Sequence, residues 1–436
     1  MTTTTIFDEF LLKLKVTNAE NISLRYGEVT RALNLQFRDN DNRDSNRLQV
    51  GSYGRYTAIK GVSDLDMLYI MPASKKNEYY NGGQLQLLKD AKQAIQNRYP
   101  STNIFVDSPV VCVKYTDFDI ELQPVFEIEN GFEYPDVNSS SWKITKPRQE
   151  ISAMKEANDT KNNNLRNLCR MTRAWKNKHG VAMGGLLIDT LAHNFLKSTD
   201  KYDYANTSHY DEMVKDFFYY LSNLNKDQVE YRALGSNQVV KVKKPFVRKA
   251  KKTYELVLKA INAKGQKNEF QKWRDIFGYY IPKIEHNIAN ESLSVYDSVA
   301  KTFNNTEEFI EDIYPVDIRY NLEIDCEVTQ AGYRPSSLRN MLKQKLKLSV
   351  KKDLKFFILE IDIPQPYQVK WKVLNRGVKA EEKNCIRGSV ENDEGYQRKI
   401  ERTDFEGEHL VECYIIKDNK VVARDFIEVP ISKGFF

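Results

Sequence analysis

The spacing of apolar positions divides the chain into three stretches with different predicted elements. In the first stretch, apolar residues recur at helical spacing over residues 5–40, beginning with Phe7, Phe10, Leu11 and Leu14. The other predicted elements are a strand at 64–71, an amphipathic helix at 82–98, and two strands within 104–127, FVDSPVVCVKY and FDIELQPVF. Strands and helices therefore mix over residues 1–150.

The second stretch, residues 151–315, is predicted to be mainly helical. The helical signal runs from about 149 to 285. Its clearest segments are NLRNLCRMTRAWKNK, GLLIDTLAHNFLK, DEMVKDFFYYLSNL, RKAKKTYELVLKAINA and NEFQKWRDIFG. Trp273, in the last of these segments, is expected to lie in the core. A polar segment at 286–308 then predicts a connector.

The third stretch, residues 316–436, changes to a period of two residues, which is typical of strands. In VKWKV, Val369, Trp371 and Val373 share one face, and the two lysines share the other. The segments KFFILEIDI, HLVECYIIK and KVVARDFIEV follow the same period, and Asp418-Asn419 is expected to close a tight hairpin. About seven short strands with turn signals predict a small β-sandwich with Trp371 in its core.

Composition and charge narrow the class of protein without indicating one function. A chain of 436 residues with 41% hydrophobic residues is typical of a globular protein with more than one domain. The net charge of +6 suits anionic ligands but does not indicate a nucleic-acid coat. The five cysteines form no CxxC pair, which argues against a zinc cluster or a disulfide framework. The N-terminus lacks a signal-peptide pattern and no stretch approaches the roughly 18 apolar residues of a membrane span, so a soluble, cytoplasmic protein is expected.

The candidate chemistry lies in GSYGRYTAIKGVSDLDMLYI, residues 51–70. Asp64 and Asp66 are two residues apart on a predicted strand, so they share a face while Leu65 points to the core. Two neighbouring carboxylates repel one another, and a magnesium ion relieves this because it prefers oxygen ligands. Asp-x-Asp alone is more often a turn or a solvated edge. An EF-hand is excluded because no glycine stands at the sixth position of the loop and no glutamate closes it.

A second strand supplies further acids, and a Gly-Ser pair supplies a candidate phosphate site. In FDIELQPVF, Asp119 and Glu121 again share a face. Acids on adjacent strands can hold two metal ions about 4 Å apart, an arrangement that serves phosphoryl or nucleotidyl transfer. Gly51 permits close backbone approach to a phosphate, and the Ser52 hydroxyl with the following amides can cradle a triphosphate. The joint pattern is much more specific than any of its parts.

This joint pattern resembles the signature of the polymerase-β-like nucleotidyltransferase superfamily. Within it, the chain looks like the CD-NTases, bacterial relatives of cyclic GMP-AMP synthase and 2′-5′-oligoadenylate synthase. The segments GSYGRYTAIKGVSDLDMLY, SWKITKPR, LCRMTRAWKN, YRALGSNQ and KWRDIFGYYIP look like SMODS-type members. The tail segments VKWKVLNRG, NCIRGSV and HLVECYIIKDNKVVARDFIEV resemble the AGS-C sensor domain. The resemblance implies an α+β fold: a catalytic sheet lobe with its N-terminal helix (1–150), a helical lobe (151–315) and a β-sandwich (316–436).

The resemblance also implies roles for particular residues. Asp64 and Asp66 would bind metal ions, and the third acid would be Glu121 or Asp119. Relatives often have the sequence pattern acid-apolar-apolar-Pro, in which the acid corresponds to Glu121. Many relatives have an aspartate as the third acid, so Asp119 stays a candidate. Basic residues near a tryptophan hold the triphosphate in relatives, which implies Arg173 and Lys176 beside Trp175; a solvated helix face is the alternative. Arg55 would contact phosphate or brace its helix. A serine of the relatives is replaced by Gly184-Gly185.

The implied function is two-metal nucleotidyl transfer with Mg²⁺ or Mn²⁺ and NTP substrates, ATP among them. The product would be a cyclic di- or trinucleotide, read by a separate effector protein in antiviral signalling. Three alternatives stay open: a synthase of linear oligonucleotides that uses NTPs or dNTPs, a catalytically silent nucleotide-binding sensor, and transfer of a nucleotide onto a protein or an antibiotic. The five histidines show no ligand spacing, so no role is assigned to them.

Overall fold

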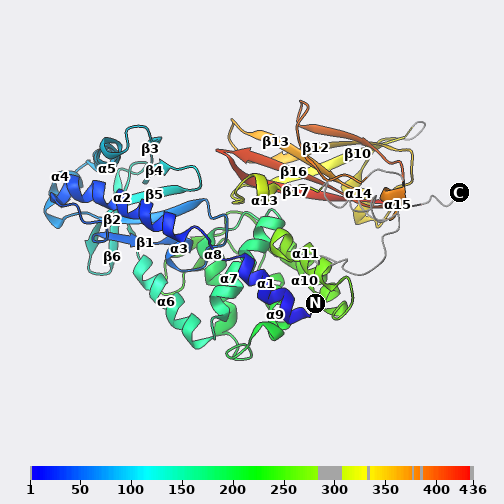
Figure 1. Cartoon of the computed structure of the whole chain (residues 1–436), viewed down its shortest axis with the longest axis horizontal. Coiled ribbons are helices and arrows are strands. Elements are labelled where there is room, and N and C mark those ends of the chain that lie inside the picture. Colours follow the sequence, from blue (N-terminus) through cyan, green and yellow to red (C-terminus); the bar gives the residue numbers. More distant parts are fainter. Residues whose placement is uncertain (1, 283–306, 331–333, 376–377, 383–385, 433–436) are drawn as a thin grey trace, which may run out of the picture. The chain divides into compact units, whose positions relative to one another are not determined.

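The computed structural model describes residues 2–282, 307–330, 334–375, 378–382 and 386–432 (Figure 1). The chain divides into two compact units. The first contains Met1–Trp175 and Met183–Pro282, and the second contains Lys176–Ala182 and Lys283–Phe436. The predicted connector at 286–308 lies almost wholly outside the described residues, as do Cys385 and His286.

A mixed sheet forms the centre of the first unit. Its strand order is β1-β2-β5-β4-β3, and β6 and β7 continue from β5. The β2–β5 pair is parallel, whereas the other pairs of this sheet are antiparallel. The strands are β1 (Arg47–Gln49), β2 (Asp64–Ile70), β3 (Ile104–Asp107), β4 (Val110–Lys114), β5 (Asp119–Ile128), β6 (Gly131–Asp136) and β7 (Ser141–Thr145).

Two long helices, α2 (Ala19–Arg38) and α5 (Gln84–Arg98), pack with this sheet to form one apolar core (Figure 1). Alternation along β2 directs Leu65 and Met67 into that core, beside Ile120 of β5. The polar residues between them therefore point to the other face of the sheet. The short elements of this lobe are α3 (Gly51–Gly54), a 3-10 turn η1 (Ala73–Lys75) and α4 (Lys76–Tyr80).

The remainder of the first unit is the helical lobe that the sequence predicts. Its elements are α6 (Pro147–Thr160), α7 (Asn164–Lys178), α8 (Gly185–Lys197), η2 (Thr207–His209), α9 (Tyr210–Ser222), β8 (Glu230–Arg232), β9 (Val239–Lys241), α10 (Val247–Asn262), α11 (Glu269–Phe277) and η3 (Gly278–Tyr280). The last three residues of α7 are grouped with the second unit. Trp273 is fully buried, as expected.

The N-terminal region differs from the single helical stretch predicted over residues 5–40. It forms two helices, α1 (Thr3–Lys13) and α2, which are separated at residues 14–18. The aromatic rings of α1 pack against the helical lobe, with the Phe7 centroid 4.9 Å from that of Trp273 and the Phe10 centroid 4.9 Å from that of Phe277. The apolar stripe of α1 therefore serves the helical lobe, whereas α2 serves the sheet.

The second unit contains the predicted β-sandwich. Its described strands form two four-stranded antiparallel sheets, ordered β11-β10-β12-β15 and β14-β13-β16-β17. One apolar core joins both sheets and includes Phe356 and Trp371. The elements are α13 (Ile310–Ile313), β10 (Leu322–Thr329), β11 (Ser336–Ser337), α14 (Leu338–Lys343), β12 (Asp353–Ile361), β13 (Gln368–Leu374), α15 (Val378–Glu382), β14 (Val390–Asn392), β15 (Arg398–Arg402), β16 (Gly407–Lys417) and β17 (Lys420–Ile431).

Two details of this unit bear on the sequence predictions. The hairpin at Asp418-Asn419 is confirmed: both residues have positive φ, and they connect β16 to β17. Lys372 lies on the face opposite Trp371, as predicted, but other parts of the chain cover this face around Lys372. Lys372 is buried and its ammonium lies 2.9 Å from Glu307. A buried lysine in a strand is therefore satisfied by an acid distant in sequence.

Candidate active site

The four acidic residues of the two predicted strands lie side by side on the parallel pair β2–β5. Asp64 is the register partner of Asp119, and Asp66 is the register partner of Glu121. Because alternate residues of a strand share a face, these acids occupy the face opposite the core formed with α2 and α5. Leu65, between the first two acids, is fully buried. The fold thus brings together the four acids that the sequence selects.

Gly51 is packed against the carboxylate of Asp66. A Cβ atom placed on Gly51 would lie 1.7 Å from Oδ2 and 2.6 Å from Cγ of Asp66, and the φ of Gly51 is +63°. Only glycine combines this backbone conformation with so close a contact. The carbonyl of Asp66 is also fixed, because it accepts hydrogen bonds from the Val50 N–H (3.2 Å) and the Tyr26 hydroxyl (2.8 Å). The Gly-Ser pair and the Asp-x-Asp strand therefore form one structural unit.

Ser52 lies in the short helix α3, where backbone contacts fold the following residues back on it. Its carbonyl accepts hydrogen bonds from the N–H groups of Thr57 (2.9 Å) and Ala58 (3.1 Å). Gly54 is equally constrained, since a Cβ atom there would lie 2.3 Å from the carbonyl oxygen of Gln49. These contacts hold residues 51–58 in a tight loop next to the acids of β2.

The two candidates for the third acid, Asp119 and Glu121, have different surroundings. Asp119 is buried, and Lys114 of β4 donates a hydrogen bond from Nζ to its Oδ2 at 2.6 Å. Glu121 is half-buried, beside Asp66 on one side and Cys112 on the other. The ammonium of Lys114 thus offsets the charge of Asp119, whereas Glu121 lies directly beside Asp66.

The donor chemistry of these acids fits a divalent cation. Mg²⁺ and Mn²⁺ prefer hard oxygen ligands, and Mg²⁺ is usually held by one or two carboxylates together with substrate phosphates and waters. Among the residues that the structure describes, no three acidic, histidine or cysteine side chains converge into a ready-made metal cage. A pair of carboxylates such as Asp64 and Asp66, completed by a nucleotide, meets the requirement of Mg²⁺ without such a cage.

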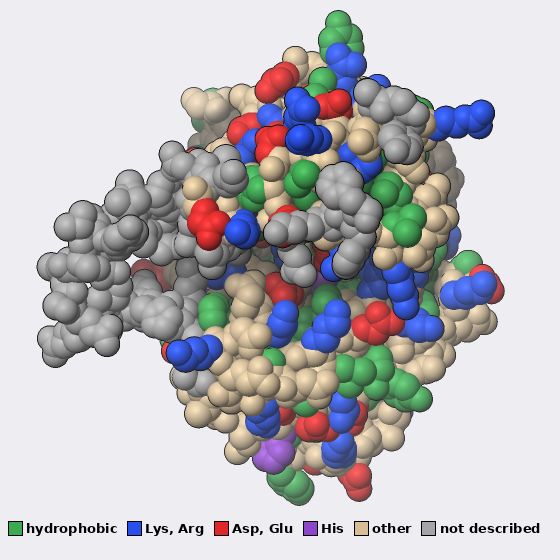
Figure 2. Space-filling model, turned by 90° about the vertical axis from the view of Figure 1, so that its right-hand side faces the viewer, with side chains coloured by type: hydrophobic (Ala, Val, Ile, Leu, Met, Phe, Trp, Pro, Cys, Tyr) green, Lys and Arg blue, Asp and Glu red, His purple; other side chains and the backbone are tan. Residues whose placement is uncertain are grey.

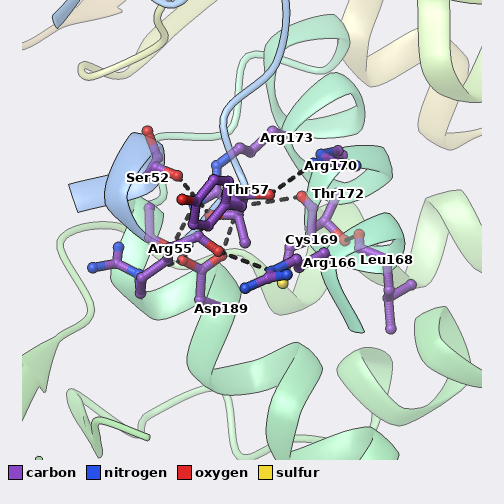
Figure 3. A network of polar contacts seen from close by, with 12 residues as sticks. Ser52, Arg55, Thr57, Arg166, Leu168, Cys169, Arg170, Thr172, Arg173 and Asp189 are labelled. Atoms are coloured by element: carbon purple, nitrogen blue, oxygen red, sulfur yellow. Dashed lines mark hydrogen bonds and ion pairs between the residues drawn. The ribbon is translucent and has the colours of Figure 1, made fainter. Parts of the chain in front are cut away.

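Arg55 lies in a buried ion-pair network that begins directly after the Gly-Ser pair (Figure 3). Its Nε is 2.8 Å from Oδ2 of Asp189, and its Nη1 is 3.3 Å from Oε2 of Glu150. Thr57 donates its hydroxyl to the same oxygen of Asp189 at 3.0 Å, and Nη1 of Arg173 lies 2.7 Å from Oδ1 of Asp189. Asp189, on α8, therefore connects the loop after Ser52 to the helical lobe.

Charge balance keeps Asp189 ionised although its side chain is fully buried. Burial works to raise its pKa, but Arg173 and Arg55 together outweigh burial and lower the pKa to about 2. Glu150 shows the opposite balance, because burial raises its pKa and Arg55 offsets this only in part. Removal of one member of such a buried ion pair leaves an uncompensated charge, so this network fixes the geometry between the sheet lobe and the helical lobe.

The structure places all three basic residues predicted to bind nucleotide in ion pairs within the chain. Arg55 is paired as described above. Arg173 also donates from Nη2 to the carbonyl of Gly185 at 3.1 Å. Lys176 belongs to the second unit, where its Nζ lies 3.1 Å from Asp317. These contacts favour bracing roles over phosphate contacts, and nucleotide binding by the three residues stays a prediction.

The sequence patterns assign no role to five further residues at the site: Lys114, Glu150, Arg166, Arg170 and Asp189. Arg166 and Arg170 hold the loop after Ser52, donating to the carbonyls of Arg55 (3.2 Å) and Tyr56 (2.9 Å). One sequence signal was present for Asp189, which interrupts the apolar segment GLLIDTLAHNFLK. A buried acid requires a cation, but the sequence does not reveal that Arg55 and Arg173 supply it.

On the side of the molecule that Figure 2 draws, neither basic nor acidic side chains dominate the surface of the described residues. Figure 2 shows Lys and Arg side chains interspersed with Asp and Glu among the described residues of this face. This distribution agrees with the modest net charge of +6. Within the described part of the chain, no helix has the length and hydropathy needed to cross a membrane.

Comparisons with known proteins match the N-terminal and the C-terminal parts of the chain. The model of the Second Messenger Oligonucleotide or Dinucleotide Synthetase (SMODS) domain matches residues 1–158. The model of the Adenylyl/Guanylyl and SMODS C-terminal sensor domain (AGS_C) matches residues 304–432. No curated protein sequence matches the chain.

Several solved structures are similar in fold. CdnC of E. coli MS115-1, solved in complex with HORMA-deltaN, is 14% identical with a TM-score of 0.50, and the match covers 64% of this chain and 98% of CdnC. CdnC with ATP is 14% identical with a TM-score of 0.49, covering 65% of this chain and 99% of that chain. The cyclic AMP-GMP synthase DncV of Vibrio cholerae is 15% identical with a TM-score of 0.44, covering 64% of this chain and 87% of that chain.

The sheet with its in-register acids, the helical lobe and the SMODS match define a nucleotidyltransferase of the polymerase-β fold. The AGS_C match falls on the β-sandwich of the second unit, which is therefore a sensor domain by family. The chain belongs to the CD-NTases of the SMODS type and carries an AGS-C sensor domain. The family expectation drawn from its motifs is confirmed.

Proposed function

We propose that this enzyme joins NTPs, ATP among them, into a cyclic di- or trinucleotide second messenger for anti-phage signalling. The product would be released in the cytoplasm and read by a separate effector protein. The observation that carries the proposal is the register of β2 and β5, which sets Asp64 beside Asp119 and Asp66 beside Glu121. The description of the SMODS domain as a synthetase of second-messenger oligonucleotides or dinucleotides supports the product class.

Asp64, Asp66 and Glu121 are the proposed ligands of two divalent cations, Mg²⁺ or Mn²⁺. Bound cations of this kind lower the pKa of an attacking hydroxyl and neutralise the leaving pyrophosphate. The contact of Gly51 with Asp66 orients that carboxylate, and Ser52 in the same loop is placed to meet a triphosphate. Asp119, held by Lys114, is the second candidate for the third acid and otherwise positions the strand.

The acceptor is a ribose hydroxyl of one nucleotide, which attacks the α-phosphorus of another. The new phosphodiester bond forms as the bond to pyrophosphate breaks, and the hydroxyl proton passes to a carboxylate, for which Glu121 and Asp66 are the candidates. A further attack, by a hydroxyl of the bound intermediate on its own α-phosphorus, closes the ring as the bond to a second pyrophosphate breaks. The network of Asp189 with Arg55 and Arg173 contributes by holding the loop that carries Gly51 and Ser52.

A product assay tests the proposal. The purified full chain is incubated with each radiolabelled NTP and dNTP, singly and mixed, with Mg²⁺ or Mn²⁺, and the products are treated with phosphatase and analysed by mass spectrometry. The control is the Asp64→Asn, Asp66→Asn double variant, which keeps the size and shape of both side chains while removing two charges and replacing one acceptor oxygen of each by an NH2 donor.

A phosphatase-resistant cyclic species that is absent from the control supports the proposal and names the bases. A ladder of linear oligomers replaces it with a linear synthase. A folded chain that binds ATP but forms no product with either metal indicates a silent nucleotide sensor, unless addition of an infected-cell extract restores synthesis.

A further inference from the structure

Phe105 of β3 lies on the sheet face that carries the candidate metal ligands. Asp66 of β2 pairs with Glu121 of β5 in the strand register. Glu121 in turn pairs with Cys112 of β4, and Cys112 pairs with Phe105. Residues that pair directly across neighbouring strands point to the same face, so the four form one row across the sheet. Ile104, the neighbour of Phe105 in sequence, turns to the other face and packs in the core.

A contact of Lys114 supports the same placement of the Phe105 ring. Nζ of Lys114 lies 2.6 Å from Oδ2 of Asp119 and 5.8 Å from the centroid of the Phe105 ring. One ammonium group therefore reaches both an acid of the site and the aromatic ring. Phe105 is 37% exposed. Single exposed apolar residues are common on protein surfaces, but this one stands in the same row as two of the proposed metal ligands.

The direction of nucleotidyl transfer assigns this side of the acids to the acceptor nucleotide. Gly51 and Ser52, the proposed triphosphate site, directly follow β1, and β1 borders β2 on the side away from β5. In a phosphoryl displacement the attacking and leaving oxygens are roughly in line, on opposite sides of the phosphorus. With the leaving pyrophosphate at Ser52, the attacking hydroxyl approaches from the side of β5. The rest of the acceptor nucleotide then extends toward β4 and β3.

The spacing of the strands fits a nucleoside between the acids and Phe105. Neighbouring strands are about 4.8 Å apart, so two strand spacings separate the backbones of Glu121 and Phe105 by about 10 Å. This is close to the length of a nucleoside from a ribose hydroxyl to the far edge of its base. Cys112, between the two residues, is buried and has a short side chain, so it leaves space for a sugar above the sheet.

We propose that Phe105 is the stacking platform for the base of the acceptor nucleotide, whose ribose hydroxyl faces Glu121. The inference rests on the proposed function, because it takes Ser52 as the triphosphate site. Every nucleobase has a π face, so an aromatic ring stacks with all of them. Phe105 thus positions the acceptor without selecting among the bases.

Binding of nucleosides tests this assignment separately from catalysis. A nucleoside has the base and the ribose hydroxyls of an acceptor but no triphosphate, so it addresses the acceptor site alone. The probes are adenosine and uridine, a purine and a pyrimidine, and ribose is the control that lacks a base. Ligand-observed saturation-transfer NMR on the full chain measures their dissociation constants. EDTA in the buffer removes divalent cations, so no nucleotidyl transfer takes place.

At least one nucleoside is expected to bind the wild type with a dissociation constant on the order of millimolar, and ribose is expected not to bind. Phe105→Ala should weaken that binding about tenfold, as removal of a base-stacking aromatic side chain does in other proteins. Phe105→Tyr keeps the ring and should bind like the wild type. Phe105→Leu keeps an apolar side chain without a π face, so it should bind as weakly as Phe105→Ala and serves if that variant does not fold.

The Phe105→Trp variant reports the contact directly. Its tryptophan fluorescence, compared with that of the wild type, should be quenched to a limiting value as nucleoside saturates the site, because the base stacks on the indole ring. Tyr204→Trp is the matched control, since Tyr204 is 92% exposed in the helical lobe. It should show only the weak quenching by free nucleoside, which does not saturate.

Failure of this inference differs from failure of the proposed function. If product forms but folded Phe105→Ala and Phe105→Leu bind nucleosides as tightly as the wild type, the platform is overturned and nucleotidyl transfer stands. If no product forms but nucleoside binding depends on the ring, the platform is supported as a nucleobase site and the proposed function is revised. The platform is also overturned if neither nucleoside binds at 10 mM, roughly ten times the expected constant, or if Phe105→Trp and Tyr204→Trp are quenched alike.

Discussion

Replacement of Gly51 by alanine tests whether the Gly-Ser loop positions the carboxylate of Asp66, a proposed metal ligand. The added methyl group would lie 1.7 Å from Oδ2 of Asp66, whereas contacts under 3.0 Å are essentially never seen for a Cβ atom. The carboxylate or the loop must therefore move by about 1.3 Å, the difference between these two distances. The substitution changes nothing else in the chemistry of the site, since alanine adds no charge and no hydrogen-bonding group.

The expected loss of activity follows from that displacement. A misplacement of about 1 Å at a reacting centre can cost on the order of 100-fold in rate. The φ of +63° adds a backbone cost of about 1–2 kcal/mol for a residue with a Cβ atom. Gly51→Ala should thus lower the rate of nucleotidyl transfer about 100-fold while lowering the free energy of unfolding by only about 1–2 kcal/mol.

The assay measures pyrophosphate release at saturating NTP, with urea unfolding in parallel. Gly82→Ala is the matched control, because Gly82 has a φ of +80° but no atom within 4 Å of the added methyl group. It should show a similar loss of stability and near-normal activity. If Gly51→Ala keeps activity within threefold of the wild type, or if Gly82→Ala loses as much, the contact of Gly51 with Asp66 does not position the carboxylate.

Three further predictions follow from the site and the sensor domain. Glu121→Gln should lower nucleotidyl transfer by at least about 100-fold and Asp119→Asn by about tenfold, in the pyrophosphate assay; the reverse order would make Asp119 the third ligand. Asp189→Asn should cost about 3–5 kcal/mol in urea unfolding at pH 7. Because the pKa of Asp189 is depressed to about 2, this advantage of the wild type should be constant above about pH 4 and should shrink as the pH falls from 4 through 2. Trp371→Ala should destabilise the sensor domain by about 3–5 kcal/mol, since Trp371 is fully buried and donates to Asp393 at 2.9 Å; an unchanged unfolding curve would contradict this.

Local patterns predicted most of the strands and the faces of their side chains. FVDSPVVCVKY, predicted as one strand, instead forms the two antiparallel strands β3 and β4. A period of two residues is a property of the strand itself, so Asp64 and Asp66 had to share a face once that strand was identified. The same reasoning placed Trp371 in the core of the sandwich and the turn at Asp418-Asn419. It was less successful near the N-terminus, where one continuous helical stretch was expected over residues 5–40. The periodicity does not reveal that α1 and α2 pack against different lobes.

The sequence by itself determined the candidate site residues, because Gly51, Ser52 and the acids of β2 and β5 stand in recognisable local patterns. Tertiary structure alone decided how they are arranged. The parallel register that sets Asp66 beside Glu121 depends on hydrogen bonds between strands more than fifty residues apart. The same holds for Lys114 beside Asp119 and for Asp189 between two arginines. Each of these contacts depends on long-range packing, which no periodicity within a single segment encodes.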